Sequence, residues 1–178
     1  MTPARTQQWG IANKIKGIEK FRFNPQSAAF FRRSTLVTKM TQQEKELFLA
    51  DLHVGVLAIP DPSHGPLTVP VWYDYKPGGD LWFLTGPTSR KGKLLKQGVR
   101  VSVCAQTETP PYKYVSIEGP VVSIAPSDRE KYGRPMAHRY LGQKLGDQYT
   151  DAGDPEASVI VRIRPEQWLA VDYGKMRL

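Results

Sequence analysis

Short runs of apolar residues recur along this chain, some nearly all apolar and some alternating with polar residues, a pattern typical of β-strands. The clearest runs are residues 53–59, 67–75, 81–85, 99–106, 112–124, 157–163 and 168–172. Glycine and proline separate most of them, and Gly78-Gly79 has the composition of a tight hairpin turn. Tight turns join antiparallel strands, so the pattern favours a barrel or sandwich over a parallel sheet.

Three other segments carry helix signals: residues 41–52, 88–98 and 126–141. Thr41 and Glu44 have the spacing of a capping box at the start of the first segment. Residues 142–155 are polar and rich in glycine and aspartate, which predicts a loop. About six or seven antiparallel strands with two or three helices give a mainly β (β+α) fold, in the proportions of a small barrel with helical inserts.

The composition of the 178 residues, 40% hydrophobic and 24% charged, indicates an ordinary globular protein with one compact domain. No apolar run is long enough to span a membrane, so no membrane partner is expected. Cys104 is the only cysteine, which excludes an intramolecular disulfide and fits a reducing compartment such as the cytoplasm. The three histidines are far apart in the sequence, so no metal site is expected.

The positive charge is concentrated at the N-terminus. Residues 1–39 contain eight basic residues and one acidic residue, and so carry +7 of the net charge of +8. Three interpretations stay open for this extension: a targeting presequence, a basic arm that binds nucleic acid or anionic membrane, and a segment without a fixed role. We favour the last, with a poorly structured extension ahead of Met40. Because the rest of the chain is nearly neutral, no nucleic-acid partner is expected for the folded domain.

The candidate chemistry lies between residues 81 and 102, which read as strand, loop, short basic helix and strand. Ser89, Arg90 and Lys91 stand at the expected start of the helix. A hydroxyl and two cations at the free N–H groups of a helix start are suited to bind a phosphate or similar anion. The alternative is a solvated basic helix face.

These residues also carry a family resemblance. The order Thr-x-x-x-Ser-Arg-Lys over residues 85–91, followed by Arg-Val-Ser-Val at 100–103, resembles the cofactor segment of pyridoxamine 5′-phosphate oxidase and its FMN-binding split-barrel relatives. Blocks at 66–75 and 111–120 are similar to neighbouring strands of that family. The resemblance implies that residues 40–178 form a flavin-binding split β-barrel.

The resemblance also implies where the cofactor binds. Ser89, Arg90 and Lys91 would hold the phosphate of FMN, and Thr85 would lie along the cofactor. The backbone beside the ring would come from the strand that contains Val69, Pro70, Val71 and Trp72. Residues of a second subunit complete the site in this family, so a homodimer with the cofactor at the subunit interface is expected, with contributions from Tyr112, Tyr114 and Trp168. For Trp72 and for these last three residues, ordinary packing is the alternative.

The resemblance does not extend to the substrate clamp of the true oxidases. Their Arg-x-His motif after the last strand is absent from the C-terminal residues 172–178, so oxidation of vitamin B6 is not expected. The expected function is an FMN- or deazaflavin-dependent oxidoreductase that acts on a small molecule. The cofactor would supply the redox chemistry, and no catalytic residue is identified. The alternatives are a non-catalytic flavin-binding or storage protein and a nucleic-acid-associated protein that acts through the basic extension.

Overall fold

The computed structural model describes residues 38–153 and 158–176. The hypotheses on the basic extension fall almost entirely on residues 1–37, which lie outside the described residues. No helix in the described part is long and apolar enough to cross a membrane.

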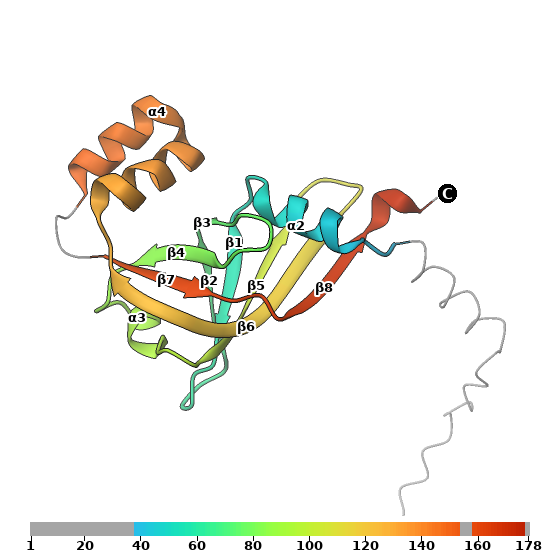
Figure 1. Ribbon diagram of the computed structural model, residues 1–178, viewed down its shortest axis with the longest axis horizontal. Helices are drawn as coiled ribbons and strands as arrows, with labels where there is room; N and C mark the ends of the chain where they lie inside the picture. Colours follow the sequence, from blue (N-terminus) through green and yellow to red (C-terminus); the bar gives the residue numbers. More distant parts are fainter. Residues whose placement is uncertain (1–37, 154–157, 177–178) are drawn as a thin grey trace, which may run out of the picture.

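A curled antiparallel sheet forms the body of the protein (Figure 1). Its strands are β1 (Gly55–Ile59), β2 (Leu67–Val71), β3 (Tyr73–Asp74), β4 (Leu81–Thr85), β5 (Arg100–Gln106), β6 (Lys113–Pro126), β7 (Val159–Ile163) and β8 (Gln167–Asp172). Their order across the sheet is β2-β1-β5-β6-β7-β4-β3, and β8 also pairs with β6. This arrangement confirms the predicted mainly β, barrel-like fold.

The helices are α2 (Gln42–Ala50), α3 (Arg90–Leu94) and α4 (Arg134–Ala152), with short η1 (Arg129–Gly133) and η2 (Tyr173–Lys175). The capping box predicted at the start of α2 is present. The amide of Glu44 donates to Oγ1 of Thr41 over 3.2 Å, and the amide of Thr41 donates to Oε2 of Glu44 over 2.6 Å.

Strand β6 connects the two halves of the sheet. Its first part pairs with β5 and β8, and its last part pairs with β7 after a bulge between Val121 and Ser123. Gly119 lies at the crossing point, where an added Cβ would stand only 1.8 Å from the backbone oxygen of Arg164. A glycine is therefore required here for lack of space.

The core is built from the inward-facing positions of the alternating strands. The largest fully buried side chains include Leu49, Leu57, Tyr73, Phe83 and Ile117. The hydroxyl of Tyr73 donates to the carbonyl of Leu49 over 2.9 Å, which satisfies the only polar group of this buried ring. Burial raises the pKa of Tyr73, so it is a neutral hydrogen-bond donor at ordinary pH.

The prediction of a loop over residues 142–155 is wrong up to Ala152. Gly142 breaks α4 with a φ of 73°, and the chain then turns back as a second helical segment beside the first (Figure 1). Gly146 permits the close approach, since an added Cβ would lie 2.6 Å from the ring of His138. The predicted start at Pro126 is also wrong, because Pro126 is the last residue of β6.

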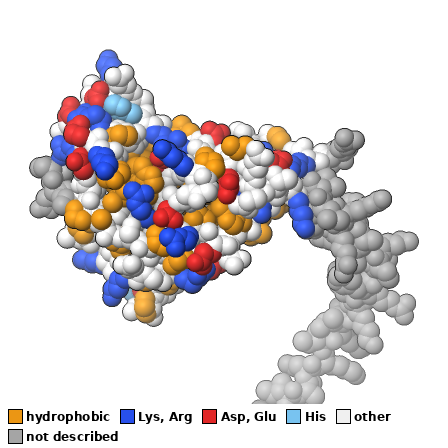
Figure 2. Space-filling view, viewed as in Figure 1, with side chains coloured by type: hydrophobic (Ala, Val, Ile, Leu, Met, Phe, Trp, Pro, Cys, Tyr) orange, Lys and Arg blue, Asp and Glu red, His pale blue; other side chains and the backbone are white. Residues whose placement is uncertain are grey.

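Polar contacts hold the two segments of α4 together. Arg134 forms ion pairs with Asp147 (2.9 Å) and Asp151 (2.8 Å), and His138 lies 2.8 Å from Asp147. Charged side chains of both signs and a histidine accordingly gather over α4 (Figure 2). The polar composition that suggested a loop therefore belongs to the ion pairs and solvent-facing surface of a helical hairpin.

Glu44 should make the stability of the domain sensitive to acid. Its pKa is lowered from 4.5 to about 2, first by the hydrogen bond from Lys175 and then by the amide of Thr41. A lowered carboxyl pKa gives stability that is present above pH 4.5 and lost as the pH falls toward 2. Melting temperatures measured from pH 6 to pH 2 should therefore fall more steeply for the wild type than for Glu44→Gln. Parallel curves would contradict this assignment.

Candidate functional site

A cleft of about 470 Å³ opens between one end of the barrel and the α4 hairpin. Its lining comes from the end of β4, from α3, from η1 and from α4. Of the residues predicted from the sequence, Trp72, Thr85, Ser89 and Lys91 line it together. The structure therefore joins the polar loop after β4 with an aromatic residue that lies between β2 and β3.

The loop after β4 is fixed by the hydroxyl of Ser89, which is the N-cap of α3. It donates to the carbonyl of Gly86 over 2.7 Å and accepts from the amide of Gly92 over 3.1 Å. Oγ1 of buried Thr85 lies 3.1 Å from it. A hydroxyl has one donor and two acceptor positions, so these three contacts use the full capacity of Ser89. A contact from Ser89 to a phosphate would have to replace one of them.

Gly92 explains why the loop and α3 lie so close together. A Cβ at this position would stand 2.3 Å from the carbonyl oxygen of Gly86 and 2.8 Å from that of Pro87. The sequence analysis did not single out this glycine. The need for a glycine here follows from the fold, in which α3 lies against the loop that precedes it.

The two adjacent cations of this loop have different surroundings. Lys91 lines the cleft, and burial lowers the pKa of its ammonium group. Within the described residues it forms no ion pair. Arg90 does not line the cleft; its guanidinium donates to Oδ2 of Asp61 over 3.0 Å, and its side chain is 61% exposed. The hydrogen bond from Arg90 is the main reason that the pKa of Asp61 is lowered.

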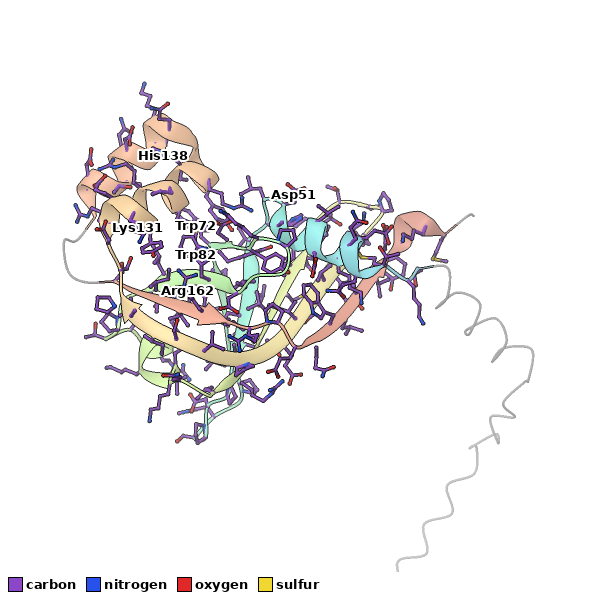
Figure 3. All side chains as sticks on the ribbon, in the orientation of Figure 1. Asp51, Trp72, Trp82, Lys131, His138 and Arg162 are labelled. Carbon is purple, nitrogen blue, oxygen red and sulfur yellow. The ribbon has the colours of Figure 1, made fainter. Side chains whose placement is uncertain are left out.

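Trp72 interrupts the strand predicted over residues 67–75 and separates β2 from β3. It lies beneath the α4 hairpin (Figure 3). Its ring stacks on Tyr140 with centroids 5.0 Å apart and 6° between the planes, and Tyr149 lies 5.4 Å away at 51°. The result is an aromatic wall on one side of the cleft.

The other residues predicted around the ring or from the second subunit do not reach the cleft within one chain. Val69, Pro70 and Val71 lie on β2, where Val71 is buried in the core. Tyr112 and Tyr114 line a separate shallow groove beside Lys113. Trp168 packs against the core and meets Tyr75 edge-on at 6.1 Å, as ordinary packing predicts.

Two polar residues that the sequence analysis missed also line the cleft. Arg129 of η1 donates to the carbonyl of Gly153 over 3.1 Å and has no ion pair within the part of the chain described. The hydroxyl of Ser127 is buried and has no hydrogen-bond partner among the described residues. No spacing in the sequence relates these residues to Lys91, because their place depends on how α4 returns over the barrel.

The hydroxyl of Tyr140 anchors α4 to the barrel at the strand break. It lies 2.7 Å from the carbonyl oxygen of His53 and 2.9 Å from that of Tyr73, and it accepts the amide of Tyr73. Arg139 adds two hydrogen bonds to the carbonyls of Ala50 and Asp51 at the end of α2. This side of the cleft is therefore positioned by hydrogen bonds to the backbone.

Removal of this anchor should destabilise the protein. Tyr140→Phe leaves buried backbone groups without their partner, and we expect a loss of about 1–3 kcal/mol in the free energy of unfolding, measured by urea titration. Tyr149→Phe is the matched control, because Tyr149 is 60% exposed and its ring faces the same Trp72. Equal stability of the two variants would contradict the anchoring role.

No group of three or more metal-ligating side chains occurs among the described residues. The cleft lining that the structure describes contains no histidine, aspartate, glutamate or cysteine. The described lining is thus suited to bind an anion and a flat apolar group, and it offers no carboxylate or imidazole for proton transfer.

Comparisons with known proteins identify the family and the fold of this chain. The family model described as pyridoxamine 5′-phosphate oxidase matches residues 40–172. No curated protein matches the chain.

Several solved structures are similar to the chain. A conserved hypothetical protein from Mycobacterium tuberculosis is 26% identical with a TM-score of 0.60, over 78% of this chain and 88% of that one. An F420 reductase is 23% identical with a TM-score of 0.59, over 70% and 94%. A FAD-binding protein from Mesorhizobium loti is 21% identical with a TM-score of 0.52, over 75% and 93%. At these identities the last two likenesses concern the fold.

Proposed function

Because the chain belongs to the pyridoxamine 5′-phosphate oxidase family, we propose that it is an oxidoreductase that uses FMN or a deazaflavin coenzyme to act on a small molecule. The observation that carries the proposal concerns Lys91. Its side chain is partly buried in a cleft with an aromatic wall, and it forms no ion pair among the described residues. The cleft volume of about 470 Å³ is in the range of small-molecule and cofactor sites. The names of the similar F420 reductase and FAD-binding protein support the same cofactor class.

The residues present fit such a cofactor. Lys91 would balance the charge of its phosphate, since a partly desolvated ammonium gains most from an anionic partner. Trp72 would lie against the ring, and Leu84 and Met136 would keep water away from it. When bound, the flavin or deazaflavin would supply the electron transfer, and the chain would bind and orient it.

We also propose a homodimer, with the cofactor at the subunit interface. Val56, Cys104, Ser116 and Leu169 are cross-strand neighbours in one row on the outer face of the sheet. This row has no charged residue, and Val56 and Leu169 are 43% and 62% exposed. Tyr114 lies on the same face, two residues before Ser116, so a second copy on this face would also cover Tyr114. Cys104 of this row is a free cysteine, and a reducing compartment suits a free thiol. We therefore propose that the protein is located in the cytoplasm.

A cofactor-binding protein without turnover is the second candidate. It is favoured by the lack of carboxylate and imidazole groups in the described lining. A nucleic-acid-associated role through residues 1–39 stays a separate prediction, which salt-sensitive RNA or DNA binding lost on their removal would support.

The absorbance spectrum and mass of any co-purified compound, with titrations of FMN and the deazaflavin, test the proposal directly. We expect binding of at least one of the two. Anaerobic reduction of the loaded protein, followed by a screen of electron acceptors, then separates the two candidates. Reoxidation by a small organic acceptor supports the oxidoreductase, and reoxidation by oxygen alone supports the binding protein. Failure to bind either cofactor would overturn both.

A further inference from the structure

Arg129 and Ser127 lie in the same cleft as Lys91 but come from a different part of the fold. Lys91 belongs to α3, next to the loop after β4, whereas Ser127 and Arg129 directly follow β6 and begin the connection to α4. Both regions contribute to the lining. The cleft therefore carries two cationic side chains supplied by two separate elements.

Arg129 has binding capacity that the described residues do not use. Its guanidinium has five N–H donors, and one nitrogen donates to the carbonyl of Gly153. No carboxylate among the described residues forms an ion pair with it, although Glu130 is adjacent in sequence and pairs instead with Arg134 at 2.7 Å. The bond to Gly153 holds the guanidinium in place, and no other described residue takes up its remaining donors.

Ser127 is the second, independent observation. Its hydroxyl is buried and finds no hydrogen-bond partner among the described residues, which is costly unless a further partner satisfies it. Its backbone is fixed by the hydrogen bond from its amide to the carbonyl of Ser158 over 2.8 Å. Ser127 and Arg129 both line the cleft, and an oxyanion bound there would accept from the hydroxyl and from the guanidinium donors that no described residue uses.

We propose that Ser127 and Arg129 form a second anion subsite of the cleft, distinct from the subsite at Lys91, and that it binds a carboxylate or phosphate group. This inference rests on the proposed function, since it assigns the anion at Lys91 to the cofactor. The second anion comes either from a cofactor with a further acidic group or from an acidic substrate. The ligands of the cleft together carry at least two anionic groups.

Flavin titrations test whether the subsites are distinct. The ratio of the dissociation constants of riboflavin and FMN measures the contribution of the FMN phosphate. We expect Lys91→Ala to reduce this ratio at least tenfold, and Arg129→Gln to leave it within about twofold. A tenfold fall of this ratio in Arg129→Gln would overturn the proposal, because Arg129 would then bind the FMN phosphate itself. An unchanged ratio in Lys91→Ala would instead contradict the proposed function.

Two further titrations, with FAD and with inorganic phosphate, identify the source of the second anion. If it belongs to the cofactor, FAD should bind more tightly than FMN, and Arg129→Gln should remove that advantage. If it belongs to the substrate, inorganic phosphate should bind to the FMN-loaded wild type and at least tenfold more weakly to FMN-loaded Arg129→Gln, with a smaller loss in Ser127→Ala. Where no flavin binds, the phosphate titration is made on the purified protein. The absence of both effects would overturn the proposal.

Arg164→Gln is the matched control, since Arg164 pairs with Asp80 at 3.6 Å and does not line the cleft. It should behave as wild type in every titration. Thermal melts of all variants check that each remains folded, so that a loss of binding reports on the subsite.

Discussion

Gly119→Ala is expected to cost about 3 kcal/mol or more of the free energy of unfolding, and to leave much of the protein unfolded at temperatures that the wild type withstands. An alanine Cβ at this position would lie 1.8 Å from the carbonyl oxygen of Arg164 and 2.9 Å from its carbonyl carbon. These are backbone atoms, so no side chain can rotate away to make room. Thermal and urea unfolding give the measurement.

The backbone around Gly119 cannot move aside easily. The amide of Arg164 donates to the carbonyl of Pro120 over 3.1 Å, and the amide of Glu166 donates to that of Glu118 over 2.9 Å. A shift that relieved the clash would break these bonds on both sides. Gly65→Ala is the matched control, because nothing lies within 4 Å of the added Cβ. Similar melting curves for the two variants would contradict the steric argument.

Lys91→Ala is expected to weaken the binding of FMN roughly tenfold to a hundredfold, as for the loss of a charge-assisted hydrogen bond to a phosphate. Arg90→Ala should have a smaller effect, because Arg90 is mostly exposed and already paired with Asp61. Lys93→Ala is the control on the same helix, since Lys93 is exposed and does not line the cleft. Fluorescence titration gives the dissociation constants. An affinity of Lys91→Ala equal to that of Lys93→Ala would show that the phosphate lies elsewhere.

The same lysine predicts a dependence on pH. Burial lowers the pKa of Lys91, so its positive charge is present below this pKa and is lost as the pH rises through it. The affinity for FMN should therefore decrease in alkaline solution at a lower pH than for an ordinary lysine. Lys91→Arg, which keeps its charge, should show no such decrease.

The strands and the first helix could be predicted because their signals are local. The capping box at Thr41 needs residues three positions apart, and the inward residues of β5 follow a period of two. The second half of α4 could not be predicted, because its polar residues are stabilised by Arg134, which belongs to the first half. Gly142 turns the chain between the two halves and interrupts the helical pattern, so no helix signal continues into the second half.

The cleft was predictable on one side only. The resemblance indicated Thr85, Ser89 and Lys91, which are close in sequence and lie together in the structure. It could not distinguish Lys91 from Arg90, since the partner of Arg90 is Asp61, 29 residues away. Ser127 and Arg129 were missed because their region was expected to be the start of a longer helix, whereas β6 continues to Pro126.

The sharing of β6 between the two halves of the barrel has an energetic consequence. Opening either half breaks hydrogen bonds of the same strand, because β6 pairs with β5, β7 and β8. The domain should therefore unfold as a single cooperative unit. Since the cleft begins where β6 ends, a ligand that binds only the folded cleft raises the melting temperature of the whole barrel.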